Sequence, residues 1–199
     1  MSGEEDIKEK EQVTGDFIPV VEQLKDIYRD VKEGPGGDQE ERYKALVRRF
    51  QQSFGHKPDF FARAPGRVNL IGEHIDYLGY SVCPTALEQD FIMAVSVNDS
   101  SDILLRNVEN VRFENKELTT DPFGKFAEEQ SWSNYVLQGF KAVAQWALKE
   151  NKDMKMKGME IMTESTVPIA AGVSSSSALT VVAAVATLYA NNLHKNLQR

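Results

Sequence analysis

Four side chains that can make charge-assisted hydrogen bonds lie within ten residues of one another in the stretch APGRVNLIGEHIDY (64–77). They are Arg67, Glu73, His74 and Asp76, and most of their neighbours are apolar. Burying such charges without partners is costly, so they must be paired or held for a ligand. Two interpretations are open at this point. Arg67 could form a structural ion pair beside an ordinary core histidine, or the set could grip a ligand rich in hydroxyl groups.

A second stretch with chemical potential is GVSSSSA (172–178), where four serines precede an alanine-rich apolar run. The first amides of a helix lack intrahelical acceptors and the helix dipole favours negative charge there, so the stretch could bind an anion. Serines are also good helix caps, and taken alone this explanation is the favoured one. The stretch has no GxxxxGK[ST] pattern and no lysine. A nucleotide bound here would need amides, hydroxyls and Mg²⁺ to neutralise its phosphates.

Composition narrows the class of protein. The 199 residues carry a formal net charge of −7, and the dense charge runs are mixed or acidic, which argues against a duplex DNA binder. The one cysteine, Cys83, cannot make an intramolecular disulfide or a cysteine-rich zinc site. The N-terminus has no apolar core typical of a signal peptide, and the apolar run 178–190 is too short to span a bilayer. We therefore expect a cytoplasmic protein with no nucleic-acid or membrane partner.

The elements that must position these stretches follow from periodicity. After an acidic tail (1–12), helical spacing predicts an amphipathic helix over residues 16–32, which EGPGGDQEER interrupts. Further helices are predicted over 43–54, capped by Gly55, over 134–149 and after the serines. Short apolar runs predict strands at 60–64, 68–72, 90–97, 102–106, 111–113 and 158–164. Helices interspersed among strands indicate an α+β domain.

Together the two stretches resemble the galactokinase family of the GHMP kinase superfamily. APGRVNLIGEHIDY and its continuation LGYSVCPTALEQDF are similar to the family's sugar-binding signature, and VPIAAGVSSSSAL resembles the superfamily's phosphate loop. The isoleucine of EHIDY and the four serines are similar to the N-acetylgalactosamine kinase branch. The resemblance implies a GHMP kinase N-terminal domain over residues 41–199, with the fold of ribosomal protein S5. Residues 1–40 would add a tail, a helix and a linker.

The resemblance assigns a role to each candidate residue. Arg67 would sit beside the reacting hydroxyl and the family's catalytic aspartate. Glu73, His74 and Asp76 would hold sugar hydroxyls, and Asp76 would read the axial hydroxyl that distinguishes galactose from glucose. Fixed carboxylates suit this task, because a buried acceptor left unpaired by the wrong epimer penalises that epimer.

The resemblance also assigns the nucleotide site. ATP would be held through its triphosphate by Gly172, Ser174, Ser175 and Ser176, and Ser176 would contribute a hydroxyl ligand to Mg²⁺. The chain departs from the family where Val173 replaces leucine and where 169–171 (Ile-Ala-Ala) replace glycine- or serine-rich positions. These larger side chains are expected to weaken nucleotide binding.

The implied reaction is ATP-dependent phosphorylation of galactose or N-acetylgalactosamine at the C1 hydroxyl, by a monomer whose partners are small molecules. Galactokinases carry a G-G-M-D-Q-like motif with the catalytic aspartate in a later segment and close the cleft with a second domain. Neither is found in residues 1–199. We therefore expect these 199 residues alone to be weakly active or inactive. A catalytically silent galactose and ATP sensor is the alternative. Another GHMP enzyme, such as a mevalonate or homoserine kinase, fits poorly with GEHIDY.

Overall fold

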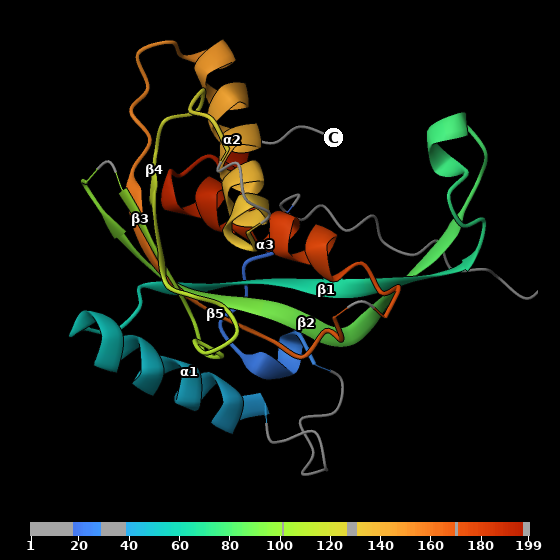
Figure 1. The fold of residues 1–199 in the computed structure, drawn as a ribbon, viewed down its shortest axis with the longest axis horizontal. Coiled ribbons are helices and arrows are strands. Elements are labelled where there is room, and N and C mark those ends of the chain that lie inside the picture. Colours follow the sequence, from blue (N-terminus) through green and yellow to red (C-terminus); the bar gives the residue numbers. More distant parts are fainter. Residues whose placement is uncertain (1–17, 29–38, 101, 127–130, 170, 197–199) are drawn as a thin grey trace, which may run out of the picture.

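The computed structural model describes residues 18–28, 39–100, 102–126, 131–169 and 171–196. Its architecture is a five-stranded mixed sheet with α2 and α3 on one face and α1 on the other (Figure 1). The elements are, in chain order, η1 (Leu24–Asp26), α1 (Gln39–Phe54), β1 (Phe60–Ile71), η2 (Asp76–Leu78), β2 (Cys83–Asn98), β3 (Asp102–Asn107), β4 (Lys116–Thr119), α2 (Ser133–Glu150), β5 (Gly158–Ser165), α3 (Ser175–Ala190) and η3 (His194–Asn196). The predicted α+β class is confirmed.

The sheet has the strand order β1-β2-β5-β3-β4. Its pairings are antiparallel except between β3 and β5, which run parallel. The chain joins these two parallel strands through β4 and α2, as a parallel pair requires a long crossover connection. The three inner strands β2, β5 and β3 are each hydrogen-bonded to a strand on both sides, and β1 and β4 are the edge strands.

Helices on both faces explain why β2 reads as an unbroken apolar run. Phe91, Met93 and Val95 belong to the larger core beneath α2 and α3, while Ile92 and Ala94 belong to a smaller core beneath α1. A strand covered on both faces gains no advantage from polar alternation. The stretch 90–95 is buried throughout.

Helix α1 forms as its apolar spacing predicts. Tyr43, Leu46 and Phe50 are buried on the sheet, and Glu40 and Glu41 lie in the first turn, where negative charge suits the helix dipole. Gly55 takes a left-handed φ of +84° and its amide donates to the carbonyl of Gln51 at 2.9 Å. This is the helix end that the sequence predicts.

Four predicted elements are wrong or incomplete. Residues 18–28 form only the single 3-10 turn η1 rather than a helix, because Leu24, Ile27 and Tyr28 pack sideways onto the core under α1; the rest of 16–32 and the acidic tail lie outside the described residues. Residues 111–113 are turn, and the strand β4 comes just after them. The two predicted strands 60–64 and 68–72 are one strand, β1, with a register shift between Pro65 and Arg67.

Strands β1 and β2 continue past the body of the sheet as a two-stranded arm that carries η2 at its tip (Figure 1). The arm exposes large apolar side chains, namely Leu70, Ile71, Tyr77, Leu78 and Tyr80. No helix in the described part of the chain is long and apolar enough to cross a membrane.

Candidate functional site

The candidate sugar-binding residues lie on the arm. Arg67 belongs to β1, whereas Glu73, His74 and Asp76 follow it in the turn before β2, with Asp76 starting η2. The sequence suggested charges within a strand-like apolar run, but all four side chains are exposed. Of the four, only Arg67 lies in a strand. Because all four side chains are exposed, none of them carries the cost of burying a charge.

Backbone geometry fixes the turn that presents this cluster. Gly72 has φ +95°, and a Cβ added there would lie 3.0 Å from a methyl of Val82, so the position requires glycine. Asn69 Nδ2 donates to the carbonyl of Gly72 at 3.2 Å and braces the turn. His74 also adopts a left-handed φ of +56°, and its ring lies 6.4 Å from that of Tyr77.

The alternative of a structural ion pair is not what the structure contains. Within the described ranges, the ion pairs involve neither Arg67 nor Glu73 nor Asp76. Their charged groups therefore stay open to solvent on one arm. This leaves them available to a ligand with several hydroxyl groups.

The serine loop forms the start of α3. Ser174 is the N-cap in a left-handed conformation (φ +59°, ψ +40°), and its side chain makes no capping hydrogen bond. The amide of Ala178 donates to the carbonyl of Ser174 at 2.9 Å as the first helical hydrogen bond. The amides of Ser175, Ser176 and Ser177 precede that bond, so they are the donors that a helix leaves for an external acceptor. The sequence alone favoured simple capping by serine, and the Ser174 side chain does not cap.

The two stretches, about a hundred residues apart in sequence, meet in the structure. The amide of Arg67 donates to the carbonyl of Val173 at 3.1 Å. Gly66 makes this approach possible, since a Cβ there would lie 3.3 Å from the same carbonyl and 3.2 Å from Val167 Cγ1. The register shift in β1 thus joins the arm to the residue that precedes the α3 N-cap.

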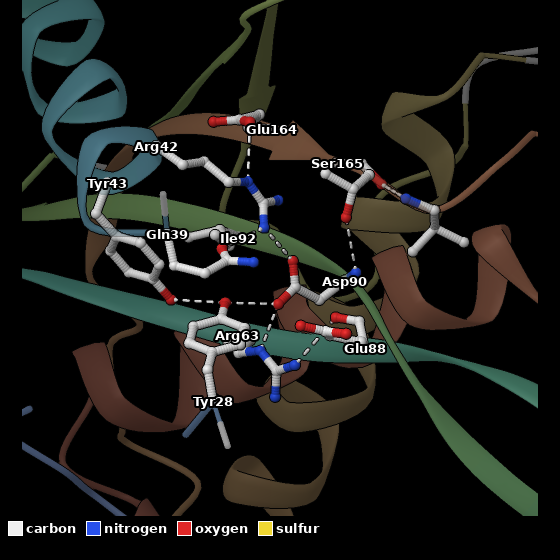
Figure 2. Close-up of polar contacts among 12 residues, drawn as sticks. Tyr28, Gln39, Arg42, Tyr43, Arg63, Glu88, Asp90, Ile92, Glu164 and Ser165 are labelled. Atoms are coloured by element: carbon white, nitrogen blue, oxygen red, sulfur yellow. Dashed lines mark hydrogen bonds and ion pairs between the residues drawn. The ribbon is translucent and has the colours of Figure 1, made fainter. Parts of the chain in front are cut away.

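Figure 2 shows a buried charge network centred on Asp90. The network lies next to this junction, because Asp90 pairs with Pro65 of β1, and the sequence patterns did not predict it. Asp90 is fully buried and accepts from Arg42 Nη1 at 2.7 Å, Arg63 Nε at 2.5 Å and the Tyr28 hydroxyl at 2.7 Å. Arg42 also reaches Glu164 at 2.9 Å. The signal in the sequence was two opposite charges, Arg63 and Asp90, inside or at the end of neighbouring apolar strands.

The network shifts the titration of its members. Burial raises the pKa of the Tyr28 hydroxyl, and its hydrogen bonds to Tyr43 and Asp90 raise that pKa further. Burial alone would lower the pKa of Arg42 and of Arg63, but Asp90, together with Glu164 for Arg42 and Tyr28 for Arg63, outweighs burial and raises the pKa of both. All three groups therefore keep their ordinary protonation state at neutral pH.

The loop fits a phosphate group better than it fits a metal ion alone. The three open amides and the serine hydroxyls are small donors at the positive end of a long helix. Among the described residues there is no group of three or more His, Cys, Asp or Glu side chains placed to hold a metal. An Mg²⁺ ion here would depend on phosphate oxygens, water and a hydroxyl such as that of Ser176.

Comparison with protein families places both stretches. Residues 48–97 match the galactokinase galactose-binding signature, and residues 134–199 match the N-terminal domain of GHMP kinases. The arm and its candidate sugar residues lie in the first match, and the serine loop lies in the second. The junction between Arg67 and Val173 joins the two.

The proteins most similar in sequence and structure include galactokinases, in agreement with the first family match. A galactokinase of Dictyostelium discoideum is 42% identical over 182 residues, which are 89% of this chain and 35% of the relative. A galactokinase of Candida maltosa is 37% identical over 77% of this chain and 72% of its own length. The structure of Lactococcus lactis galactokinase with galactose superposes with a TM-score of 0.64 at 28% identity, covering 79% of this chain and 39% of the other. The chain thus spans about a third of the length of most of its curated relatives.

Proposed function

This chain belongs to the galactokinase family of the GHMP kinases, and we propose that it forms the sugar- and ATP-binding part of a sugar 1-kinase. The reaction is transfer of the γ-phosphoryl group of ATP to the C1 hydroxyl of galactose or N-acetylgalactosamine. One observation carries the proposal, namely the hydrogen bond between the Arg67 amide and the Val173 carbonyl. It brings the stretch 64–77 next to the loop 172–178, and this supports the proposal because direct transfer requires the two ligands to lie side by side.

The sugar is proposed to bind along the arm. Glu73 and Asp76 are exposed and hold carboxylate oxygens free of ion pairs in the described residues, so each can accept hydrogen bonds from sugar hydroxyls. His74 adds a ring nitrogen to the same turn. Arg67 lies at the junction, where its guanidinium would stabilise negative charge that develops on the phosphoryl group during transfer.

ATP is proposed to bind at the start of α3. Gly172, with φ +72° and open space around its Cβ position, lets a phosphate approach the backbone. Ser174, Ser175 and Ser176 would supply amides and hydroxyls, and Ser176 would also be a ligand of Mg²⁺. When bound, Mg²⁺ neutralises charge on the β- and γ-phosphate oxygens.

Titration calorimetry with galactose tests the sugar site. We expect the Asp76→Ala variant to lose measurable binding, because truncation removes a charged acceptor that the sugar would otherwise pair with. Because Asp76 is exposed, the thermal denaturation midpoint of the Asp76→Ala variant should equal that of the wild type.

Asp153→Ala is the matched control, since Asp153 is also exposed but lies in the connection between α2 and β5. It should bind galactose like the wild type, and glucose should bind neither protein well. Unchanged galactose affinity in Asp76→Ala would remove this residue from the site. Absence of galactose binding by the wild-type chain would contradict the proposed function itself.

A further inference from the structure

The buried carboxylate of Asp90 is not used in the proposed function, although it accepts three side-chain hydrogen bonds. It is fully buried, and two arginines and one tyrosine donate to it. Taking one carboxylate and two guanidiniums out of water carries a large desolvation cost. A carboxylate in this position needs an explanation in terms of what it holds in place.

Asp90 lies where the pairing of β1 and β2 becomes irregular. Pro65 pairs with Asp90, and the next pair is Arg67 with Ala86. Between these pairs β1 advances two residues (65 to 67) while β2 advances four (90 to 86). Three residues of β2 (87–89) therefore lie opposite the single residue Gly66 of β1, a surplus of two. Such a bulge bends a strand and re-aims the side chains beside it.

Arg63 holds this bulge closed. Its Nε donates to Asp90 Oδ2 at 2.5 Å, and its Nη2 donates to the carbonyl of Glu88 at 3.4 Å. Leu87 is one of the three residues opposite Gly66, and its side chain packs 3.4 Å from the position that a Gly66 Cβ would occupy. One side chain thus bridges the start and the middle of the bulge, which ends beside Arg67.

The backbone of Asp90 also anchors the strand that leads to the serine loop. Its amide donates to Thr166 Oγ1 at 3.1 Å, and its carbonyl accepts from the amide of Thr166 at 3.0 Å. Strand β5 ends at Ser165, and Val167 then packs against Gly66. Asp90 therefore touches both chain segments that meet at the hydrogen bond between Arg67 and Val173.

We propose that Asp90, acting through Arg63, is a positioning residue that sets the β1–β2 bulge and so fixes Arg67 against the residue preceding the α3 N-cap. Its meaning for phosphoryl transfer rests on the proposed function, but the positioning is a property of the fold. Arg42 provides an internal comparison. It binds the other oxygen of Asp90 from α1 and also binds Glu164, and its hydrogen bonds include none to the bulge or to the serine loop.

Amide hydrogen exchange of the Arg67 N–H, measured by NMR, tests this without any ligand. Arg63→Gln and Arg42→Gln each remove one guanidinium from the same buried carboxylate, so both should lower global stability. After correction for global unfolding, we expect exchange at Arg67 to be about tenfold faster in Arg63→Gln than in the wild type. Arg42→Gln should leave corrected exchange at Arg67 unchanged.

Equal effects of the two substitutions on Arg67, or no effect of Arg63→Gln, would overturn the proposal and leave Asp90 a structural residue. Arg63→Lys, which keeps a charge beside Asp90, guards against misfolding and should restore part of the protection. Nucleotide titration then distinguishes a failure of the proposed function from a failure of the positioning role of Asp90. A wild-type chain that fails to bind nucleotide contradicts the proposed function, whereas the exchange result stands by itself. If the wild type binds, Arg63→Gln should weaken binding severalfold more than Arg42→Gln.

Discussion

Charged residues of this protein fall into two groups by exposure. Asp90 pairs with Arg42 and Arg63 inside the fold. Glu73 and Asp76 stand exposed on the arm, outside every ion pair of the described ranges. A buried charge that loses its partner destabilises the fold, whereas an exposed one can exchange water for a ligand. The first group therefore organises the site and the second group is free to bind.

His56 gives a pH-dependent prediction at this scale. Its Nδ1 lies 3.0 Å from the carbonyl of Lys57 and its Nε2 lies 2.8 Å from Glu160 Oε2. The hydrogen bond to Lys57 and then the charge of Glu160 raise the pKa of His56 above the ordinary value for histidine. A pKa raised by folding means that the protonated ring contributes stability below the unfolded-state pKa and loses it as pH rises through the folded-state pKa.

Denaturant unfolding of the wild type and His56→Gln between about pH 5 and pH 9 checks this, since that range brackets the titration of histidine. The stability gap between them should be largest at the acidic end and should close above neutral pH. The difference in stability between the wild type and Glu160→Gln should decrease with rising pH in the same way, because Glu160 is the charged partner of His56. A gap that does not change with pH would show that the charge of His56 has no part in stability.

At this scale the sequence singled out the exposed charged residues of the arm but not the buried charge network around Asp90. Glu73, His74 and Asp76 are close together in the sequence, and they stay close in the structure because one turn carries all three. Asp90 and Arg63 are 27 positions apart and become neighbours only through the register of β1 and β2. Strand register depends on tertiary packing, so no local spacing reveals such a pair.

Packing of α2 on α3 is the element-scale feature that builds the larger core. Gly139 lies on α2 where α3 comes nearest, and a Cβ there would lie 2.8 Å from the amide nitrogen of Ala184 and 2.9 Å from Ala183 Cβ, and would overlap the carbonyl of Thr180. Two of these three atoms are backbone atoms of a helix and cannot rotate away. The absence of a side chain at Gly139 therefore sets the distance between the two helices.

Gly139→Ala should separate the helices and lower the free energy of unfolding by about 1–3 kcal/mol, because overpacking outweighs the better helix propensity of alanine. Chemical denaturation of the wild type and variant measures it. Gln138→Ala, at an exposed position one residue away, should leave stability nearly unchanged. If Gly139→Ala were as stable as the wild type, α2 could not be held at this distance by Gly139.

Elements with strong periodicity were predictable, and those shaped by tertiary contacts were not. Helices α1 and α2 carry clear apolar faces and were expected within a few residues of their ends. The predicted helix over 16–32 failed in the described part because Tyr28 turns inward to Asp90. Strand β4 was missed because KELT has little apolar character and pairs only as an edge strand beside β3.

At the scale of the whole molecule, the two stretches that are proposed to bind ligands meet at one junction, on a chain that spans about a third of the length of most relatives. Its apolar arm is open to solvent, with Tyr77 and Ile71 more than two-thirds exposed. The proposed binding of sugar and ATP uses the arm and the serine loop, and both lie within these residues. Transfer needs in addition a group that takes or balances the proton of the anomeric hydroxyl. The expectation of a cytoplasmic monomer stays a prediction.

A polypeptide limited to these 199 residues is therefore expected to bind galactose and MgATP but to transfer phosphate poorly. Arg67 can stabilise charge in the transition state, yet a guanidinium only donates hydrogen bonds and cannot accept the sugar proton. Loss of a positioned base costs about 10²–10⁴-fold in rate, so galactose-dependent release of ADP should fall at least that far below an intact family member. The galactokinase of Dictyostelium discoideum is a suitable reference under identical conditions. Calorimetry on the same sample should show that both ligands bind, so that slow turnover reports chemistry and not an empty site. ADP release at the rate of the intact enzyme would mean that residues 1–199 contain their own base, and the roles assigned to the arm would then need revision.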